Sequence, residues 1–137
     1  MKILIAMNSF KGSLSAIEAT DVVEKAALEL KFKKSDLYKI PMVDGGTDSL
    51  EAWSELLDLK PIKAETLDPL GNPITTTYLY DQNNKNAYIE MAKASGVHLV
   101  DPSPKTIFEA NSFGTGVLIQ EAIKKGLGPL TDYILTF

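Results

Sequence analysis

The sequence contains no cysteine and only one histidine, His98, among its 137 residues. Without cysteine the chain has no disulfide framework and no thiolate metal site, and one histidine leaves no histidine-rich metal centre. Basic residues cluster no further than short pairs such as Lys33-Lys34, and the formal net charge is -4. A nucleic acid or an anionic membrane is therefore not the partner that the sequence predicts.

A long hydrophobic run is also missing. The segment from Met1 to Met7 is apolar apart from Lys2, but it is too short for a signal peptide with its cleavage site or for a membrane-spanning helix. The expected location is the cytoplasm. Hydrophobic residues make up 45% of the chain, which is ordinary for a globular protein with a substantial core.

The first elements along the chain follow the order strand, loop, helix. Residues 3–7 are a short apolar run that predicts a strand of the parallel-sheet type, buried on both faces. A polar loop follows over 8–13. Ser15 and Glu18 then form a capping-box pattern at the start of a helix that reaches about Leu30. This order predicts the start of a Rossmann-like α/β domain.

A second strand and helix follow the first pair. The strand is expected over 37–42 and ends at the sequence Asp44-Gly45-Gly46. Thr47 or Ser49 can cap the helix that comes next. Its apolar residues, three and four positions apart, are Leu50, Trp53, Leu56 and Leu57.

The pattern changes after this helix to three β-rich runs separated by turns. The predicted strands are 60–67, 74–80 and 87–91, and the predicted turns are 68–71 and 81–85. We therefore predict an α/β fold with a Rossmann-like βα start of one domain, 1–66. A mixed α/β segment with an antiparallel meander, 67–137, starts a second domain. Residues 133–137 look like another strand, and we interpret an ending within an apolar strand as a sign of a truncated chain.

Three glycine-containing loops lie where a strand or loop leads into a helix, the place where α/β proteins bind anions. In the first, Lys11 could neutralise a phosphate, Gly12 could allow close backbone approach, and Ser9 or Ser13 could donate hydrogen bonds. The loop is not a Walker A motif, because the order is Lys-Gly-Ser and the upstream glycine is absent. An ordinary loop with a solvated lysine and a helix cap remains the alternative.

The second loop places the carboxylate of Asp44 beside Gly45 and Gly46, which suits Mg²⁺ binding or activation of a hydroxyl. The alternative is a tight turn in which Asp44 caps the following helix. The third loop, Gly114-Thr115-Gly116, opens a helix expected to begin near Val117. It predicts an anion cradle, with close packing as the alternative.

One carboxylate falls within an apolar strand. Glu90 stands between Ile89 and Met91, and an exposed face of the meander explains it at least as well as catalysis does. Periodicity and spacing thus indicate an α/β protein with anion-friendly loops and name no substrate.

Five motifs in the same order resemble the bacterial glycerate kinase family. Residues 8–16 are similar to the family's Asp-Ser-Phe-Lys-Gly-Ser-Leu-Ser-Ala, and residues 41–46 to its Pro-Met-Ala-Asp-Gly-Gly. Residues 68–71 are similar to its Gly-Pro-Leu-Gly, and residues 89–96 to its Ile-Glu-Met-Ala-Glu-Ala-Ser-Gly. Residues 112–116 are similar to its Tyr-Gly-Thr-Gly. The resemblance implies a two-domain kinase that phosphorylates glycerate with ATP and Mg²⁺. It also implies that Asp44 serves as base or metal partner and that Lys11 offsets phosphoryl charge.

The chain departs from the family at Asn8, which replaces an aspartate, and at Thr47-Asp48, which replaces Glu-Gly. Family members also continue well beyond residue 137, so we expect an N-terminal fragment without turnover of its own. A non-catalytic module that binds a small anion or nucleotide is the alternative function. A Rossmann oxidoreductase is disfavoured because no Gly-x-Gly-x-x-Gly follows the first strand.

Overall fold

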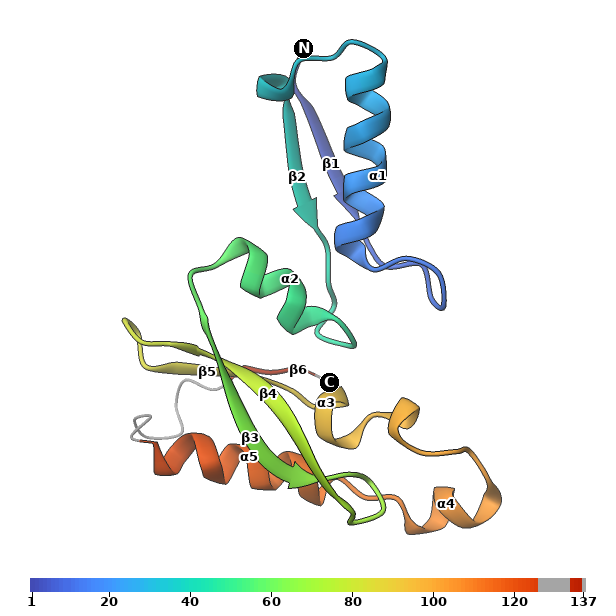
Figure 1. Ribbon diagram of the computed structural model, residues 1–137, viewed down its shortest axis with the longest axis vertical. Coiled ribbons are helices and arrows are strands. Elements are labelled where there is room, and N and C mark those ends of the chain that lie inside the picture. The colour runs from blue at the N-terminus through green and yellow to red at the C-terminus, as the bar shows by residue number, and fades with distance from the viewer. Residues whose placement is uncertain (126–133, 137) are drawn as a thin grey trace. The chain divides into compact units, whose positions relative to one another are not determined.

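The computed structural model describes residues 1–125 and 134–136 (Figure 1). The chain forms two compact units, Met1–Asp44 and Gly45–Phe137, and each is described by itself. The chain thus combines helices with parallel and antiparallel strands, which confirms the predicted α/β class.

The first unit is a strand–helix–strand arrangement. Strands β1 (Ile3–Met7) and β2 (Leu37–Pro41) pair in parallel, with Ile3 opposite Leu37 and Met7 opposite Pro41. Helix α1 (Ala16–Glu29) and a 3₁₀ helix (Lys34–Asp36) connect them. The βα start that the sequence predicts is therefore confirmed.

The predicted capping box starts helix α1. The Glu18 N–H donates to Ser15 Oγ at 3.2 Å, and the Ser15 N–H donates to Glu18 Oε2 at 2.8 Å. Two N–H groups near the helix start are satisfied in this way, which fixes where the helix begins.

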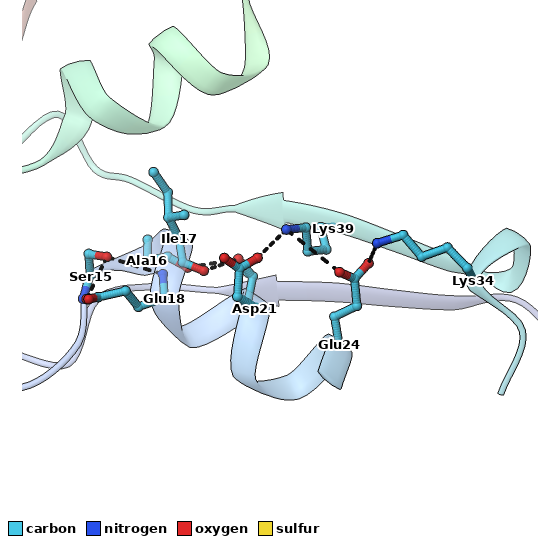
Figure 2. Close-up of polar contacts among 9 residues, drawn as sticks. Ser15, Ala16, Ile17, Glu18, Asp21, Glu24, Lys34 and Lys39 are labelled. Carbon is cyan, nitrogen blue, oxygen red and sulfur yellow. Dashed lines mark hydrogen bonds and ion pairs between the residues drawn. The ribbon is translucent and has the colours of Figure 1, made fainter. Parts of the chain in front are cut away.

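Charged side chains connect α1 to the chain that returns beside it (Figure 2). Lys39 of β2 forms an ion pair with Asp21 and lies 3.9 Å from Glu24 Oε2. Lys34 Nζ also pairs with Glu24 Oε1 at 2.5 Å. These contacts run from α1 to β2 and to the 3₁₀ helix that precedes it.

The two faces of the β1–β2 sheet differ in burial. Ile5 is 2% exposed on the side of α1, whereas Leu4 is 62% exposed on the other side. Tyr38 and Ile40 of β2 are exposed on that second face too. The prediction of a first strand buried on both faces is therefore wrong, because α1 covers only one face of the described sheet.

The second unit contains a mixed four-stranded sheet in the order β3-β4-β5-β6. Strands β3 (Lys60–Leu67), β4 (Pro73–Asp81) and β5 (Asn86–Glu90) are antiparallel, which confirms the meander. Strand β6 (Ile134–Thr136) pairs in parallel with β5, which confirms the final strand within 134–136. Its flanking residues 133 and 137 lie outside the described residues.

The turn between β3 and β4 has the predicted geometry. The Gly71 N–H donates to the Asp68 carbonyl at 3.0 Å, and Gly71 has a φ of +85°. Asp68 Oδ1 accepts the N–H groups of Leu70 at 2.8 Å and Asn72 at 2.9 Å. The side chain of Asp68 therefore stabilises the turn.

Helices cover both faces of the sheet at strand β5 (Figure 1). Helix α5 (Phe113–Lys124) lies on one face, where Ile89 and Ala87 join Leu118 in the core cluster. Helix α2 (Ser49–Leu56) lies on the other, where the rings of Trp53 and Tyr88 meet edge to face at 5.6 Å. The sheet is therefore the middle of three layers.

Three short helices link β5 to α5. They are α3 (Ala92–Ser95), a 3₁₀ helix (Val97–Leu99) and α4 (Pro104–Glu109). The compact units divide after Asp44, so α2 belongs with the meander and not with the first βα unit. The predicted division into domains, 1–66 and 67–137, stays a prediction.

Candidate functional site

The parallel pairing in the first unit brings two of the predicted site segments to one edge. Met7 and Pro41 end their strands opposite each other, and the Met42 N–H donates to the Met7 carbonyl at 2.8 Å. The loop after β1 and the segment that leads to Asp44 therefore leave the same end of the sheet. This end is the carboxyl edge at which open α/β sheets bind ligands.

The loop after β1 is a tight turn with Lys11 at its tip. The N–H groups of Ser13 and Leu14 donate to the Phe10 carbonyl at 2.8 and 3.1 Å, and the Phe10 N–H donates to the Leu14 carbonyl. Gly12 has a φ of +73°, a conformation that favours glycine, so the turn itself requires it. Lys11 is exposed, as both phosphate binding and solvation require.

Asn8 and Ser9 lie at the base of the same loop. The Ser9 N–H donates to Asn8 Oδ1 at 2.7 Å. An aspartate at this position could accept the same hydrogen bond with a charged oxygen. Asn8 thus makes this hydrogen bond without the negative charge that an aspartate would carry.

The loop from Gly45 to Asp48 leads directly into helix α2. Gly45 has a φ of +90°, so a side chain there would be strained. Asp48 is the N-cap residue in a left-handed conformation (φ +71°) and makes no side-chain cap bond. The N-cap position thus falls on Asp48, and not on Thr47 or Ser49 as the sequence suggested. The alternative in which Asp44 shapes this turn and caps α2 stays a prediction.

Glu90 supplies the cap from a distant part of the sequence. Its Oε2 accepts the Leu50 N–H at 3.1 Å, and its side chain is almost fully buried, at 1% exposed. Its Oε1 has no hydrogen-bond partner among the described residues. The explanation of Glu90 by an exposed face of the meander is wrong, because α2 covers that face.

Burial raises the pKa of Glu90 above its ordinary value of 4.5. The Leu50 N–H and the charge of Lys93 oppose this rise, whereas the negative charges of Glu51 and Asp48 add to it. Glu90 is thus a carboxyl group inside the second unit whose charged form is disfavoured by its surroundings.

Sequence reasoning did not include Glu90 among the site residues, although the strand pattern held a clue. Side chains alternate along a strand, so Glu90 shares a face with Tyr88, not with Ile89. An aromatic residue on that face indicates a packed layer above it, and a carboxylate within such a layer needs a specific partner.

Helix α3 connects this region to the start of α5. Lys93 Nζ forms an ion pair with Glu51 Oε1 of α2 at 2.5 Å. Burial by itself lowers the pKa of Lys93, but the hydrogen bond and charge of Glu51, together with the charges of Glu90 and Asp48, raise the pKa above its ordinary value. Two residues further on, Ser95 Oγ lies 2.7 Å from Thr115 Oγ1 of α5.

The Gly114-Thr115-Gly116 segment is the first turn of α5, and not a loop before it. The helix begins at Phe113, four residues before the predicted start at Val117. Gly114 and Thr115 are buried, and a Cβ on Gly114 would lie 1.9 Å from the Leu67 carbonyl oxygen. Gly114 is therefore needed for close packing against β3.

Gly116 differs from Gly114 in this respect. It is exposed, and a Cβ there would meet nothing within 4 Å. Of the three residues of the predicted cradle, only Gly116 is thus open to solvent. Thr66 Oγ1 donates to the Gly114 carbonyl at 2.5 Å, which ties this turn to β3.

Two further properties hold for residues 1–125 and 134–136. They contain no group of three or more His, Asp or Glu side chains that could hold a metal ion. They also contain no helix with the length and apolar character needed to cross a membrane. The sequence identifies no metal ligands, and no cluster of side chains among these residues identifies them either.

These features define an α/β protein in which the loop that carries Lys11 and the segment that leads to Asp44 leave the carboxyl edge of two parallel strands. The glycerate kinase family model matches residues 3–131, and the chain belongs to this family. The resemblance predicted from five motifs is thereby confirmed.

The chain is similar to curated relatives that are named as kinases. It is 37% identical to a glycerate kinase of Haemophilus influenzae over 93% of the chain, and 36% identical to a glycerate 2-kinase of Escherichia coli over 92%. It spans 33% of the length of each of these relatives. The activity of a whole relative can therefore only be proposed for this chain.

A solved structure has the same fold. A crystal structure assigned as a glycerate kinase 2 of Salmonella typhimurium LT2 matches with a TM-score of 0.77 and 34% identity. The match covers 99% of this chain and 36% of that one.

Proposed function

We propose that this chain carries part of the active site of a glycerate kinase, which transfers the terminal phosphoryl group of ATP to a hydroxyl of glycerate. The observation that supports it most is the shared edge of β1 and β2, from which Lys11 and Asp44 both emerge. Family membership supplies the substrate class.

The proposed chemistry needs a base and a cation. The glycerate hydroxyl oxygen attacks the γ-phosphorus while the bond to the ADP oxygen breaks, and the hydroxyl proton passes to a base. Asp44 is the proposed base or metal partner. Lys11 offsets the negative charge that the phosphoryl oxygens carry during transfer.

The described residues fit a magnesium ion that is held mainly by the nucleotide. Mg²⁺ usually binds through one or two carboxylates, several waters and substrate phosphates, so it does not need three protein ligands. Asp44 would supply such a carboxylate, and the ion would neutralise phosphate charge when bound.

The remaining site residues have different proposed tasks. Ser9 and Ser13 donate hydrogen bonds to substrate or phosphate beside Gly12, and Gly45 and Gly46 allow the backbone to approach it. Within α5, Gly116 is the residue proposed to face phosphate. Gly114 and Thr115 are buried, and Gly114 packs this turn against β3.

The test uses the complete reading frame that contains this chain, since the chain spans about a third of its relatives. ADP production is measured with ATP, Mg²⁺ and glycerate for the wild type, Lys11→Ala and Asp44→Asn. Loss of a charged group that acts in the transition state lowers kcat by about 10²-fold or more. Lys25→Ala and Asp58→Asn, at exposed positions, are the matched controls and should stay near wild type.

Several results would overturn the proposal. One is glycerate turnover that Asp44→Asn and Lys11→Ala leave intact. Another is a stop codon directly after Phe137 together with a stable chain that binds ATP but does not turn it over, which favours the binding module. We also propose that the 137-residue chain alone gives no ADP signal. The cytoplasmic location stays a prediction.

A further inference from the structure

Helix α2 begins without a cap from its own neighbourhood. The N–H groups of the first turn of a helix have no partners within the helix and need acceptors. Asp48 occupies the N-cap position, but its side chain makes no cap bond. The acceptor for the Leu50 N–H is instead Glu90 Oε2, from the end of strand β5.

The same helix start also fixes the loop before it. Ser49 is fully buried, and its Oγ donates to the Gly46 carbonyl at 2.7 Å. The Ser49 N–H donates to the same carbonyl at 3.3 Å. The loop from Gly45 to Asp48 is therefore attached to a helix start, and Glu90 attaches that helix start to the sheet.

Charged groups surround Glu90 from two elements. Lys93 of α3 favours its charged form, while Glu51 of α2 and the N-cap residue Asp48 disfavour it. A carboxyl group with one unpaired oxygen in a buried layer is costly for stability. A cost of this kind at a helix start next to a proposed site calls for a role beyond packing.

We propose that Glu90 is a positioning residue that holds the start of α2, and with it the Gly45–Asp48 loop, in the arrangement the proposed substrate site uses. This inference rests on the proposed function for the use of the loop. The structural part, the dependence of the loop on Glu90, can be tested without any substrate.

Two substitutions separate the cap from simple burial. In Glu90→Gln an amide oxygen remains to accept the Leu50 N–H. In Glu90→Met the side chain has similar length and no acceptor oxygen, so the Leu50 N–H loses its partner. Glu65→Gln is the matched control, because Glu65 is an exposed glutamate on strand β3.

The first experiment measures amide hydrogen exchange by NMR on the 137-residue chain. We expect the protection of the Leu50 amide to fall at least tenfold in Glu90→Met and to change less than about threefold in Glu90→Gln and Glu65→Gln. Protection of the Leu118 amide in α5 serves as the internal reference. Equal Leu50 protection in the Met variant and the wild type would overturn the proposal.

A second measurement covers the case in which Glu90→Met does not fold. The Leu50 amide shift should follow a titration in the wild type with a midpoint above 4.5, and this titration should be absent in Glu90→Gln. A Leu50 titration that persists unchanged in Glu90→Gln would mean that another group controls this amide, and the proposal would fail.

The third arm uses the complete enzyme. We expect Glu90→Met to lower kcat/KM for glycerate at least tenfold and Glu90→Gln to restore most of it. If the exchange result holds but the wild type turns over no glycerate, the proposed function fails and the positioning role stands. If turnover is normal but Glu90→Met leaves loop exchange and kcat/KM unchanged, the positioning role fails.

Discussion

Two glycines in one helix turn provide a sharp test of how α5 packs. Gly114 and Gly116 are two residues apart, and both have ordinary helical backbones. A methyl group on Gly114 would lie 1.9 Å from the Leu67 carbonyl oxygen, whereas real Cβ contacts stay above 3.0 Å. Helix α5 or strand β3 would therefore have to move by about 1 Å, as the difference between these distances shows.

The magnitude follows from three contributions. Alanine in place of glycine gains about 1 kcal/mol within a helix. At Gly114 this gain is opposed by overpacking against a rigid backbone group, about 3 kcal/mol. Distortion of the hydrogen bond from Thr66 Oγ1 to the Gly114 carbonyl adds about 1 kcal/mol. Gly114→Ala should thus lower the free energy of unfolding by about 3 kcal/mol, and Gly116→Ala should raise it by about 1 kcal/mol.

Urea unfolding followed by far-UV circular dichroism measures both values in the 137-residue chain. The two variants carry the same chemical change, so a difference of about 4 kcal/mol between them reports the local space alone. If both variants shift stability in the same direction and within about 1 kcal/mol of each other, the close approach of α5 to β3 is wrong.

Three other changes test separate features of the fold. Ser15→Ala removes the cap of α1 and should cost about 1 kcal/mol in urea unfolding, while Ser54→Ala, on an exposed side of α2, should cost less. Leu118→Ala empties the centre of the core cluster and should cost about 2–5 kcal/mol, and a loss below about 1 kcal/mol would place Leu118 outside the core. The raised pKa of Glu90 means that its carboxyl group stabilises the fold fully below 4.5 and loses this contribution as the pH rises through the raised value. The unfolding free energy of the wild type should therefore fall relative to Glu90→Gln as the pH rises above 4.5, and a rise would contradict the assignment.

Local sequence signals predicted most individual elements correctly. The capping box at Ser15 and Glu18 located the start of α1, and the Asp68–Gly71 pattern gave the turn between β3 and β4. These features depend on residues within a few positions of one another. Their geometry is set before any tertiary contact is made.

Contacts between distant segments were the part that the sequence did not reveal. Tyr88 indicates a packed layer on the face of Glu90, but no residue near Glu90 in the sequence identifies α2 as that layer, so its burial was missed. Gly114 was predicted to face an anion because glycine serves both close packing and anion binding. Only the position of Leu67 shows which of the two applies.

The proposed site likewise has a part that local sequence patterns predicted and a part that they did not. The order of strand, loop and helix was enough to predict the segments that carry Lys11 and Asp44. Their common edge follows from the parallel pairing of β1 with β2, which the βα pattern implies. The remote cap on α2 had no comparable pattern in the sequence.

The cap on α2 also has a consequence for the order of folding. Leu50 and Glu90 are 40 positions apart in the chain, and α2 spans only eight residues. A helix this short is unstable by itself in water. The acceptor for its Leu50 N–H, Glu90 Oε2, is in place only when β5 has paired with β4. Helix α2 should therefore form late, after the meander, and the Gly45–Asp48 loop should be among the last segments of the second unit to become ordered.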